Sequence, residues 1–164
     1  QGNLVLIKNL KNEASKRHID TNRLIFAKRM SSIADHLSRH RMADLFIDTF
    51  PYGAHSTCAD ALWAGVPVIT LAGESFASKV SASLLNAIGL SELITNTEKE
   101  YEDLAVELAT NPKRLEEIKD KLQKNRLTKP LFNSDLYTKN IETAYTIMQE
   151  KYLKNSPVEN IEIY

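Results

Sequence analysis

The stretch DLFIDTFPYGAHSTCADALWAG, residues 44–65, decides the fold of this 164-residue chain. An apolar run at Leu45–Ile47 predicts a short buried strand, and a loop containing Pro51 and Gly53 follows it. Thr57–Ala64 has the pattern of a helix that begins directly after this loop. A strand, a loop and a helix in this order form the unit from which parallel sheets covered by helices are built.

Short apolar runs and helical patterns also alternate on both sides of this stretch. The predicted strands are Leu4–Ile7, Leu24–Phe26, Leu45–Ile47, Val66–Leu71 and a weak Leu93–Ile94, and the predicted helices between them are about Leu10–His18, Ser32–Arg39, Thr57–Ala64 and Phe76–Ile88. Such alternation is typical of a parallel sheet with helices on both faces. We therefore expect an α/β fold.

Beyond the last predicted strand the pattern becomes purely helical. Helix starts are predicted at a capping box of Thr97 with Glu100, at Pro112 in a first turn, and at Ser134 as the cap of a long final helix over residues 134–153. The apolar stripe of this final helix is expected to face inward: Tyr137, Ile141, Ala144, Tyr145, Met148 and Tyr152. Asn, Ser, Pro and Glu dominate the end of the chain, so we expect residues 154–164 to be a flexible tail.

Composition excludes several classes of function. Lys plus Arg and Asp plus Glu both total 21, so the chain has no excess positive charge for nucleic acid or anionic membranes, and we expect neither as a partner. No apolar run is long enough to span a bilayer. Cys58 is the only cysteine, which excludes an internal disulfide and fits a reducing compartment such as the cytoplasm. The chain starts at Gln1 without a Met, so we expect it to begin inside a longer protein.

The candidate ligand site is the start of the predicted helix after the loop. In an open parallel sheet, ligands bind beyond the carboxyl ends of the strands, where a helix start offers backbone N–H groups and its positive dipole end to phosphate. His55, Ser56 and Thr57 stand at this start and can add donors around a diphosphate, and Asp60 lies one turn further, placed to bond a ribose. Alternatively, Ser56 or Thr57 is only an N-cap and His55 an ordinary loop residue, and spacing alone does not decide between these interpretations.

Longer segments carry a specific resemblance. YGAHSTCADALWAGVPVIT (52–70) and GESFASKVSASLLNAIGLSELI (73–94), and then EYEDLAVELATNP and LTKPLFNSDLYTKNIETAY, resemble the C-terminal donor-binding region of the O-linked N-acetylglucosamine transferase family, which includes SPINDLY-like plant proteins. The resemblance covers roughly residues 22–152. It implies a Rossmann-like, doubly wound parallel sheet, the C-terminal half of a GT-B glycosyltransferase, and transfer of N-acetylglucosamine or another hexose from a UDP-sugar to protein Ser/Thr. Many members of the family carry tetratricopeptide repeats upstream.

The resemblance assigns roles to the residues at the helix start. It implies that His55, Ser56 and Thr57 hold the diphosphate, with His55 stabilising the leaving group, and that Asp60 holds the ribose. No Asp-x-Asp pattern is present to hold a metal ion at the phosphates, so we expect neither a metal nor another cofactor. Tyr52 stands eight residues before Asp60, where retaining enzymes of this architecture carry an acid, so we expect inversion. No catalytic base is assigned.

The segment SSIADHLSRHRMAD, residues 31–44, resembles the part of the family that wraps the uridine. The resemblance implies that His36 stacks on the uracil and that Arg39 lies beside the nucleotide. A lysine frequent in the family is replaced by Ile33, so its contact is absent or comes from elsewhere. Without the resemblance, His36 and Arg39 would be read as an exposed helix face.

These patterns lead to a domain assignment and leave three functions open. Residues 1–153 are expected to form the UDP-sugar-binding domain without its first βα unit, so that Leu4–Ile7 would be the second strand, and this piece alone is expected to be inactive. The alternatives to a protein Ser/Thr transferase are a GT-B enzyme with another acceptor, such as an Asn side chain or a small molecule, and a non-catalytic GT-B-like binding module. Trp63 is expected to pack against the sheet, and Cys58 to be a buried helix residue.

Overall fold

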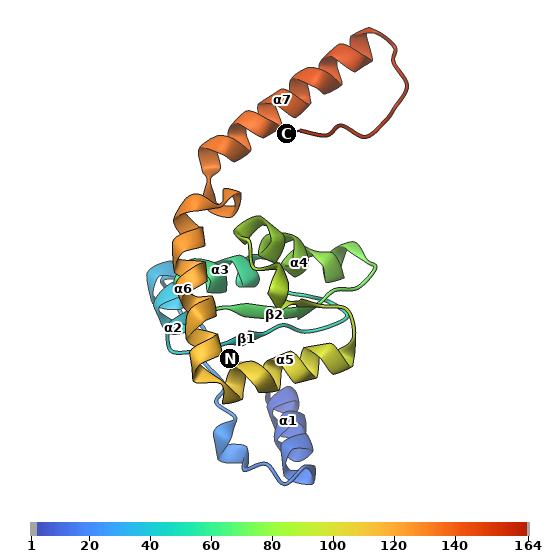
Figure 1. Cartoon of the computed structure of the whole chain (residues 1–164). Coiled ribbons are helices and arrows are strands. Elements are labelled where there is room, and N and C mark those ends of the chain that lie inside the picture. The colour runs from blue at the N-terminus through green and yellow to red at the C-terminus, as the bar shows by residue number, and fades with distance from the viewer. Residues whose placement is uncertain (1–2, 164) are drawn as a thin grey trace. The chain divides into compact units, whose positions relative to one another are not determined.

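The computed structural model describes residues 3–163 and divides the chain into two compact units, Gln1–Arg39 and His40–Tyr164. The first unit contains helix α1 (Leu4–Lys16), the short 3-10 helix η1 (Thr21–Arg23) and most of helix α2 (Ile33–His40). The second unit contains all of the described strands and the remaining helices (Figure 1).

Leu4–Ile7 is the beginning of a helix, so the prediction of a strand there is wrong. The Asn3 side chain caps α1 by accepting a hydrogen bond of 2.9 Å from the backbone N–H of Val5. No Gly or Pro interrupts the helix, and His18 follows it with a left-handed φ of 58°. A short apolar run becomes a strand only where another strand pairs with it, and among the described residues no strand does.

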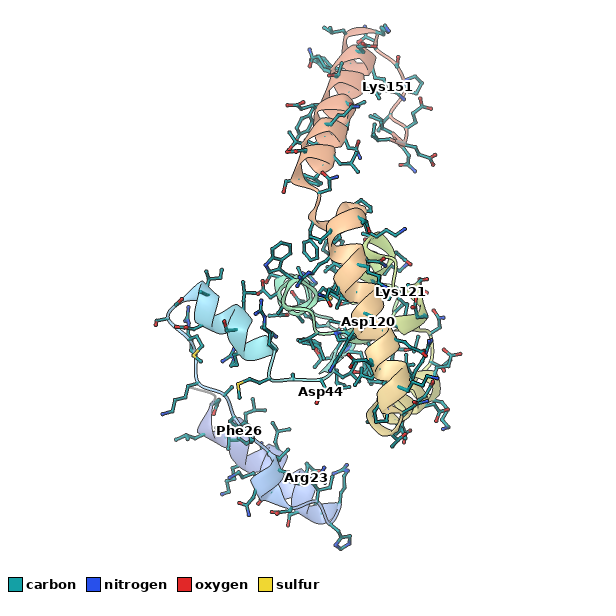
Figure 2. The ribbon with its side chains drawn as sticks, turned by 60° about the vertical axis from the view of Figure 1, so that its left-hand side comes forward. Arg23, Phe26, Asp44, Asp120, Lys121 and Lys151 are labelled. Atoms are coloured by element: carbon teal, nitrogen blue, oxygen red, sulfur yellow. The ribbon has the colours of Figure 1, made fainter. Side chains whose placement is uncertain are left out.

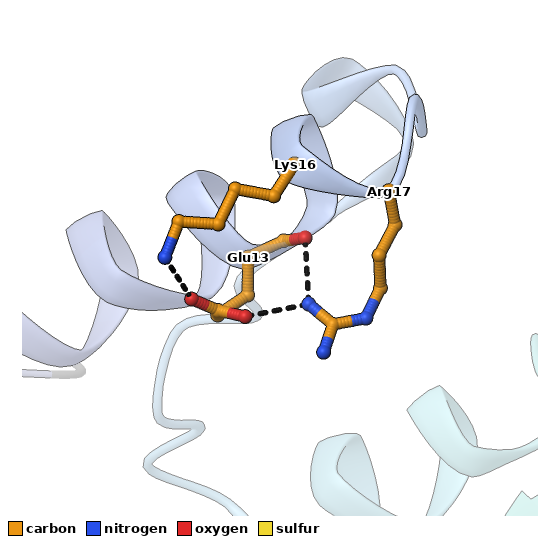
Figure 3. A network of polar contacts seen from close by, with 3 residues as sticks. All are labelled: Glu13, Lys16 and Arg17. Atoms are coloured by element: carbon orange, nitrogen blue, oxygen red, sulfur yellow. Dashed lines mark hydrogen bonds and ion pairs between the residues drawn. The ribbon is translucent and has the colours of Figure 1, made fainter.

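The end of α1 carries a small cluster of charges, shown in Figure 3. The Glu13 carboxylate accepts hydrogen bonds from Lys16 Nζ at 2.7 Å and from an Arg17 guanidinium nitrogen at 2.5 Å. These two bonds hold the pKa of Glu13 below its ordinary value. The basic residues stand where the negative end of the helix dipole favours them.

The predicted strand at Leu24–Phe26 is also absent. These residues follow η1 as irregular backbone, in the segment where Figure 2 labels Arg23 and Phe26. The prediction of a helix at Ser32–Arg39 is confirmed by α2.

The second unit is built on a three-stranded parallel sheet. The strands β1 (Phe46–Ile47), β2 (Val68–Leu71) and β3 (Ile94–Thr95) lie in the order β1-β2-β3, with Phe46 opposite Val68 and Thr70 opposite Ile94. Helices α3 (Ser56–Ala64) and α4 (Phe76–Ile88) lie on one side of this sheet and α5 (Glu98–Thr110) on the other (Figure 1). The predicted α/β fold with a doubly wound parallel sheet is therefore confirmed.

Local signals position the ends of these elements. Gly65 and Gly89 end α3 and α4 with left-handed φ values of 91° and 74°, which glycine adopts without steric cost. The capping box of Thr97 and Glu100 opens α5 as predicted, and Pro112 stands in the first turn of α6 (Pro112–Thr128).

A long-range contact joins α6 to the segment before β1, where Figure 2 labels Asp44. The Asp44 carboxylate accepts a hydrogen bond of 2.8 Å from the α6 residue Lys119.

The hydrophobic core lies between the sheet and its helices. Its fully buried aliphatic side chains come from α3, β2, α4, the residue before η2, η2 itself (Ser91–Leu93), α5 and α6: Leu62, Val68, Ile69, Leu85, Ile88, Leu90, Leu93, Leu108, Ile118 and Leu122. Cys58 is fully buried among them, as predicted. The core thus supports β2 and α3 directly beneath the candidate site.

Trp63 does not pack against the sheet, and that prediction is wrong. Its side chain is 47% exposed, its ring meets the ring of Phe132 at 5.0 Å, and the Arg126 guanidinium lies 5.5 Å from the ring centroid. The neighbouring Leu62 occupies the sheet-facing position of α3 instead. Successive helical residues point about 100° apart, so Leu62 and Trp63 cannot both face the sheet.

The final helix α7 (Ser134–Leu153) has the predicted bounds but not the predicted cap or packing. The capping residue is Asn133, whose side chain accepts a hydrogen bond of 2.9 Å from the N–H of Leu136, and Ser134 is already helical. No α7 residue is buried in the described structure, so the predicted inward stripe is wrong. An apolar stripe shows which face of a helix can pack against a partner but not whether a partner is present.

The end of the chain follows α7. Residues 154–163 contain no helix or strand, and Lys151, labelled in Figure 2, forms an ion pair with Glu159 in this segment.

Candidate functional site

A hollow of about 530 Å³ opens at the carboxyl end of β1. It is lined by residues of β1, of the following loop and of the start of α3: Phe46, Ile47, Asp48, Thr49, Tyr52, Gly53, Ala54, His55, Ser56 and Thr57. The structure therefore brings the predicted residues His55, Ser56 and Thr57 together at one opening.

The start of α3 is exposed to this hollow. His55 is the N-cap residue but makes no side-chain capping bond, and its carbonyl accepts bonds from the N–H groups of Cys58 and Ala59. Ser56 and Thr57 are the first helical residues and are exposed, so the alternative in which one of them is merely the N-cap is wrong. The first turn of a helix has N–H groups without partners inside the helix, and these favour an anion.

The His55 ring is held between aromatic neighbours. It stacks on Tyr52, with centroids 5.2 Å apart and planes 13° apart, and meets the edge of Phe76 at 6.0 Å. Its Nε2 atom is buried and has no hydrogen-bond partner within residues 3–163. A buried ring nitrogen without a partner is unfavourable, and it leaves His55 with hydrogen-bonding capacity that the described part of the protein does not use.

Asp48 anchors the loop that leads to His55, and the sequence patterns do not predict this role. Its side chain is only 4% exposed. One carboxylate oxygen accepts from the N–H groups of Thr49 and Ala54 at 2.8 and 2.7 Å, and the other accepts from the Thr70 hydroxyl at 2.8 Å. An acid directly after a predicted strand is the one local signal for it, because its partner on β2 is distant in sequence.

Tyr101 connects the same point to α5. Its hydroxyl donates a hydrogen bond of 2.5 Å to the backbone carbonyl of Asp48. Burial, with a smaller contribution from the Asp48 charge, raises the pKa of Tyr101 to about 12. The phenol therefore stays protonated and keeps this bond at neutral pH.

The remaining predicted residues are placed less directly. Asp60 is half-buried on α3 and does not line the hollow, so its contact with a ribose stays a prediction. His36 and Arg39 belong to the first unit. One guanidinium nitrogen of Arg39 lies 3.0 Å from His36 Nδ1, and the other terminal nitrogen donates a hydrogen bond of 2.6 Å to the Lys28 carbonyl. Both are half-buried and, together with Ile33, help to line a separate hollow of about 320 Å³.

Two further features bear on the chemistry of the site. Burial raises the pKa of Cys58 to about 12, so this thiol is not a nucleophile at neutral pH. Within residues 3–163, no three His, Cys, Asp or Glu side chains are grouped so that they can hold a metal ion. No helix within residues 3–163 combines the length with the apolar character needed to cross a membrane.

Known proteins resemble this chain in sequence, and one solved structure resembles it in fold. The family model for glycosyl transferase family 41 matches residues 5–141. The protein SEC of Arabidopsis thaliana, named a probable UDP-N-acetylglucosamine–peptide N-acetylglucosaminyltransferase, is 38% identical over 80% of this chain. SPINDLY of Hordeum vulgare, with the same description, is 36% identical over 72% of the chain, and the Caenorhabditis elegans enzyme of this type is 32% identical over 89%.

A solved structure agrees with these sequence matches. The K341M mutant of the Thermobaculum terrenum O-GlcNAc transferase is 32% identical and superimposes with a TM-score of 0.80, over 89% of this chain and 28% of that chain. The fold and these relatives define a glycosyltransferase domain. The chain belongs to glycosyl transferase family 41. It spans only 12–14% of the length of the curated relatives.

Proposed function

We propose that this chain is the nucleotide-sugar-binding part of an inverting glycosyltransferase that transfers N-acetylglucosamine, or another hexose, from a UDP-sugar to Ser or Thr of a protein. The observation that supports this most directly is the buried, unpartnered Nε2 of His55 beside the exposed start of α3. Membership of family 41 and the activities for which the relatives are named support the same conclusion.

The chemistry required by such a transfer suits the start of α3. Departure of UDP places negative charge on a diphosphate, and donors fixed in advance around that charge stabilise the transition state. His55, Ser56 and Thr57 supply these donors in our proposal, together with the N–H groups of the first helical turn. Asp60 would hold the ribose, and His36 and Arg39 would contact the uridine.

The proposed function also specifies a donor, an acceptor and a cellular location for the protein. The donor is a UDP-sugar, and the acceptor is a protein or peptide bound through a part of the enzyme outside residues 1–153, so the 164-residue chain alone should not transfer sugar. A cytoplasmic location fits the single buried cysteine.

Titration of the 164-residue chain with UDP and with uridine, followed by NMR, tests the proposal. If the start of α3 binds the diphosphate, UDP binds more tightly than uridine and selectively shifts the backbone amides of residues 53–60. Equal affinities and equal shifts for the two ligands would show that this helix start has no role in phosphate binding.

A further inference from the structure

Asp48 has a position that direct contact with a ligand does not explain. It follows β1 at the edge of the sheet where the hollow opens, yet its side chain is almost fully buried. Its two carboxylate oxygens together accept three hydrogen bonds from Thr49, Ala54 and Thr70. The carboxylate is therefore occupied by the protein itself.

These bonds close the loop between β1 and α3. The same oxygen of Asp48 accepts from the N–H groups at both ends of the loop, Thr49 and Ala54, and Ala54 directly precedes His55. The Oδ2 atom accepts from Thr70 and so fixes the carboxylate to the buried strand β2. The loop is short, so holding both of its ends leaves little freedom for the Tyr52 ring and for His55.

Contacts to α4 complete this arrangement. The N–H of Gly53 donates to the carbonyl of Ala77 at 3.1 Å, and the Ser81 hydroxyl donates to the carbonyl of Ala54 at 2.7 Å. A Cβ atom on Gly53 would lie 3.1 Å from Asp48 Oδ2 and 3.2 Å from the Ala77 carbonyl oxygen, so only glycine fits without displacement. The loop is thus packed tightly between Asp48 and α4.

A buried carboxylate is an unfavourable neighbour for an anion. Burial of a charge is costly, and a negative charge near a diphosphate weakens its binding. Some gain in binding geometry is needed to offset both effects. Here the gain is that the His55 ring and the first turn of α3 are held in a fixed orientation.

We propose that Asp48 is a positioning residue of the donor site: its carboxylate holds residues 49–54 so that His55 and the start of α3 face the diphosphate. This inference rests on the function proposed above. In this role Asp48 acts through the loop, because both of its carboxylate oxygens are already bonded within the protein.

Three variants separate positioning from charge and from stability. Asp48→Asn keeps an oxygen for the N–H groups of Thr49 and Ala54, and its amide N–H can donate to the Thr70 hydroxyl, so the loop is retained without the charge. Asp48→Ala removes all three bonds. Thr95→Val is the matched control, because it removes one buried hydrogen bond, from the Thr95 hydroxyl to the Thr70 carbonyl, and leaves every bond of Asp48 in place.

The experiment measures UDP and uridine affinities of the 164-residue chain and its three variants by calorimetry, with melting temperatures for each. Asp48→Ala is expected to weaken UDP binding about tenfold while leaving uridine binding unchanged, since it misdirects several charge-assisted hydrogen bonds. Asp48→Asn and Thr95→Val are expected to keep UDP affinity within about twofold of the parent chain. Equal loss of UDP binding in Asp48→Ala and Thr95→Val, or loss in Asp48→Asn, would overturn the inference.

A second readout does not depend on UDP. In the parent chain, NMR should show slow hydrogen exchange at the Ala54 amide and nuclear Overhauser contacts between the Tyr52 and His55 rings, and Asp48→Ala should lose both. If the parent chain does not distinguish UDP from uridine, the proposed function fails, and these signals still decide whether Asp48 holds the loop. Retention of both signals in Asp48→Ala would refute the positioning role.

Discussion

Replacing His55 should weaken UDP binding without a matching loss of folding stability. The His55 ring makes two aromatic contacts, to Tyr52 and to Phe76, and each such contact contributes about 0.5–1.5 kcal/mol. Its buried Nε2 has no partner in the described part of the chain, and such an atom costs about 1–3 kcal/mol. The favourable and unfavourable contributions are therefore of similar size.

Two substitutions at this position should consequently behave differently. His55→Ala loses both the contacts and the unpartnered nitrogen, so its free energy of unfolding should stay within about 1 kcal/mol of the parent chain. His55→Phe keeps an aromatic ring and removes the nitrogen, so it should be more stable by about 1 kcal/mol, which raises Tm by about 2–4 °C. A functional site that is strained for its task commonly becomes more stable when the functional group is removed.

Both variants should lose donor binding to a similar degree. We expect UDP affinity to fall about tenfold in each, with uridine affinity unchanged, because one hydrogen bond to a charged phosphate is removed. The assays are urea unfolding, thermal melting and calorimetric titration of the two ligands. A His55→Phe chain that is less stable than the parent, or one that binds UDP as tightly, would refute this reasoning.

Three other predictions concern the core and two titrating groups. Leu62→Ala should lower the free energy of unfolding by about 2–5 kcal/mol, and by more than Trp63→Ala, because Leu62 is fully buried and Trp63 is about half exposed; urea unfolding of both variants checks this order. Cys58 should resist a soluble thiol reagent at pH 8 in the folded chain and react once urea unfolds it, since burial raises its pKa to about 12; rapid reaction of the folded chain would contradict this. The pKa of Tyr101 is raised to about 12 in the folded state from an ordinary value of 10.0. The contribution of Tyr101 to stability is therefore complete below about pH 10 and is lost as the pH rises toward about 12. In unfolding experiments at different pH values, Tyr101→Phe should lose less stability over this range than the parent chain.

Local sequence patterns were sufficient to predict most elements of the second unit. The bounds of α4, the capping box of α5 and the start of α6 at Pro112 agree with prediction because caps, proline and glycine act over a few neighbouring residues. The position of the start of α3 was predictable for the same reason, since a short strand, a loop and a helix follow one another without interruption, although β1 is partly exposed and not buried as predicted.

Which apolar residues acquire a packing partner depends on tertiary contacts. Leu4–Ile7 forms a helix because no described strand pairs with it, the apolar stripe of α7 stays uncovered within residues 3–163, and Trp63 points away from the sheet because Leu62 occupies the facing position. The contacts of Asp48 join residues 22 and 53 positions apart in the chain, at Thr70 and Tyr101. Pairing, burial and such long-range hydrogen bonds depend on chain segments that meet only after folding, so local patterns of residues do not specify them.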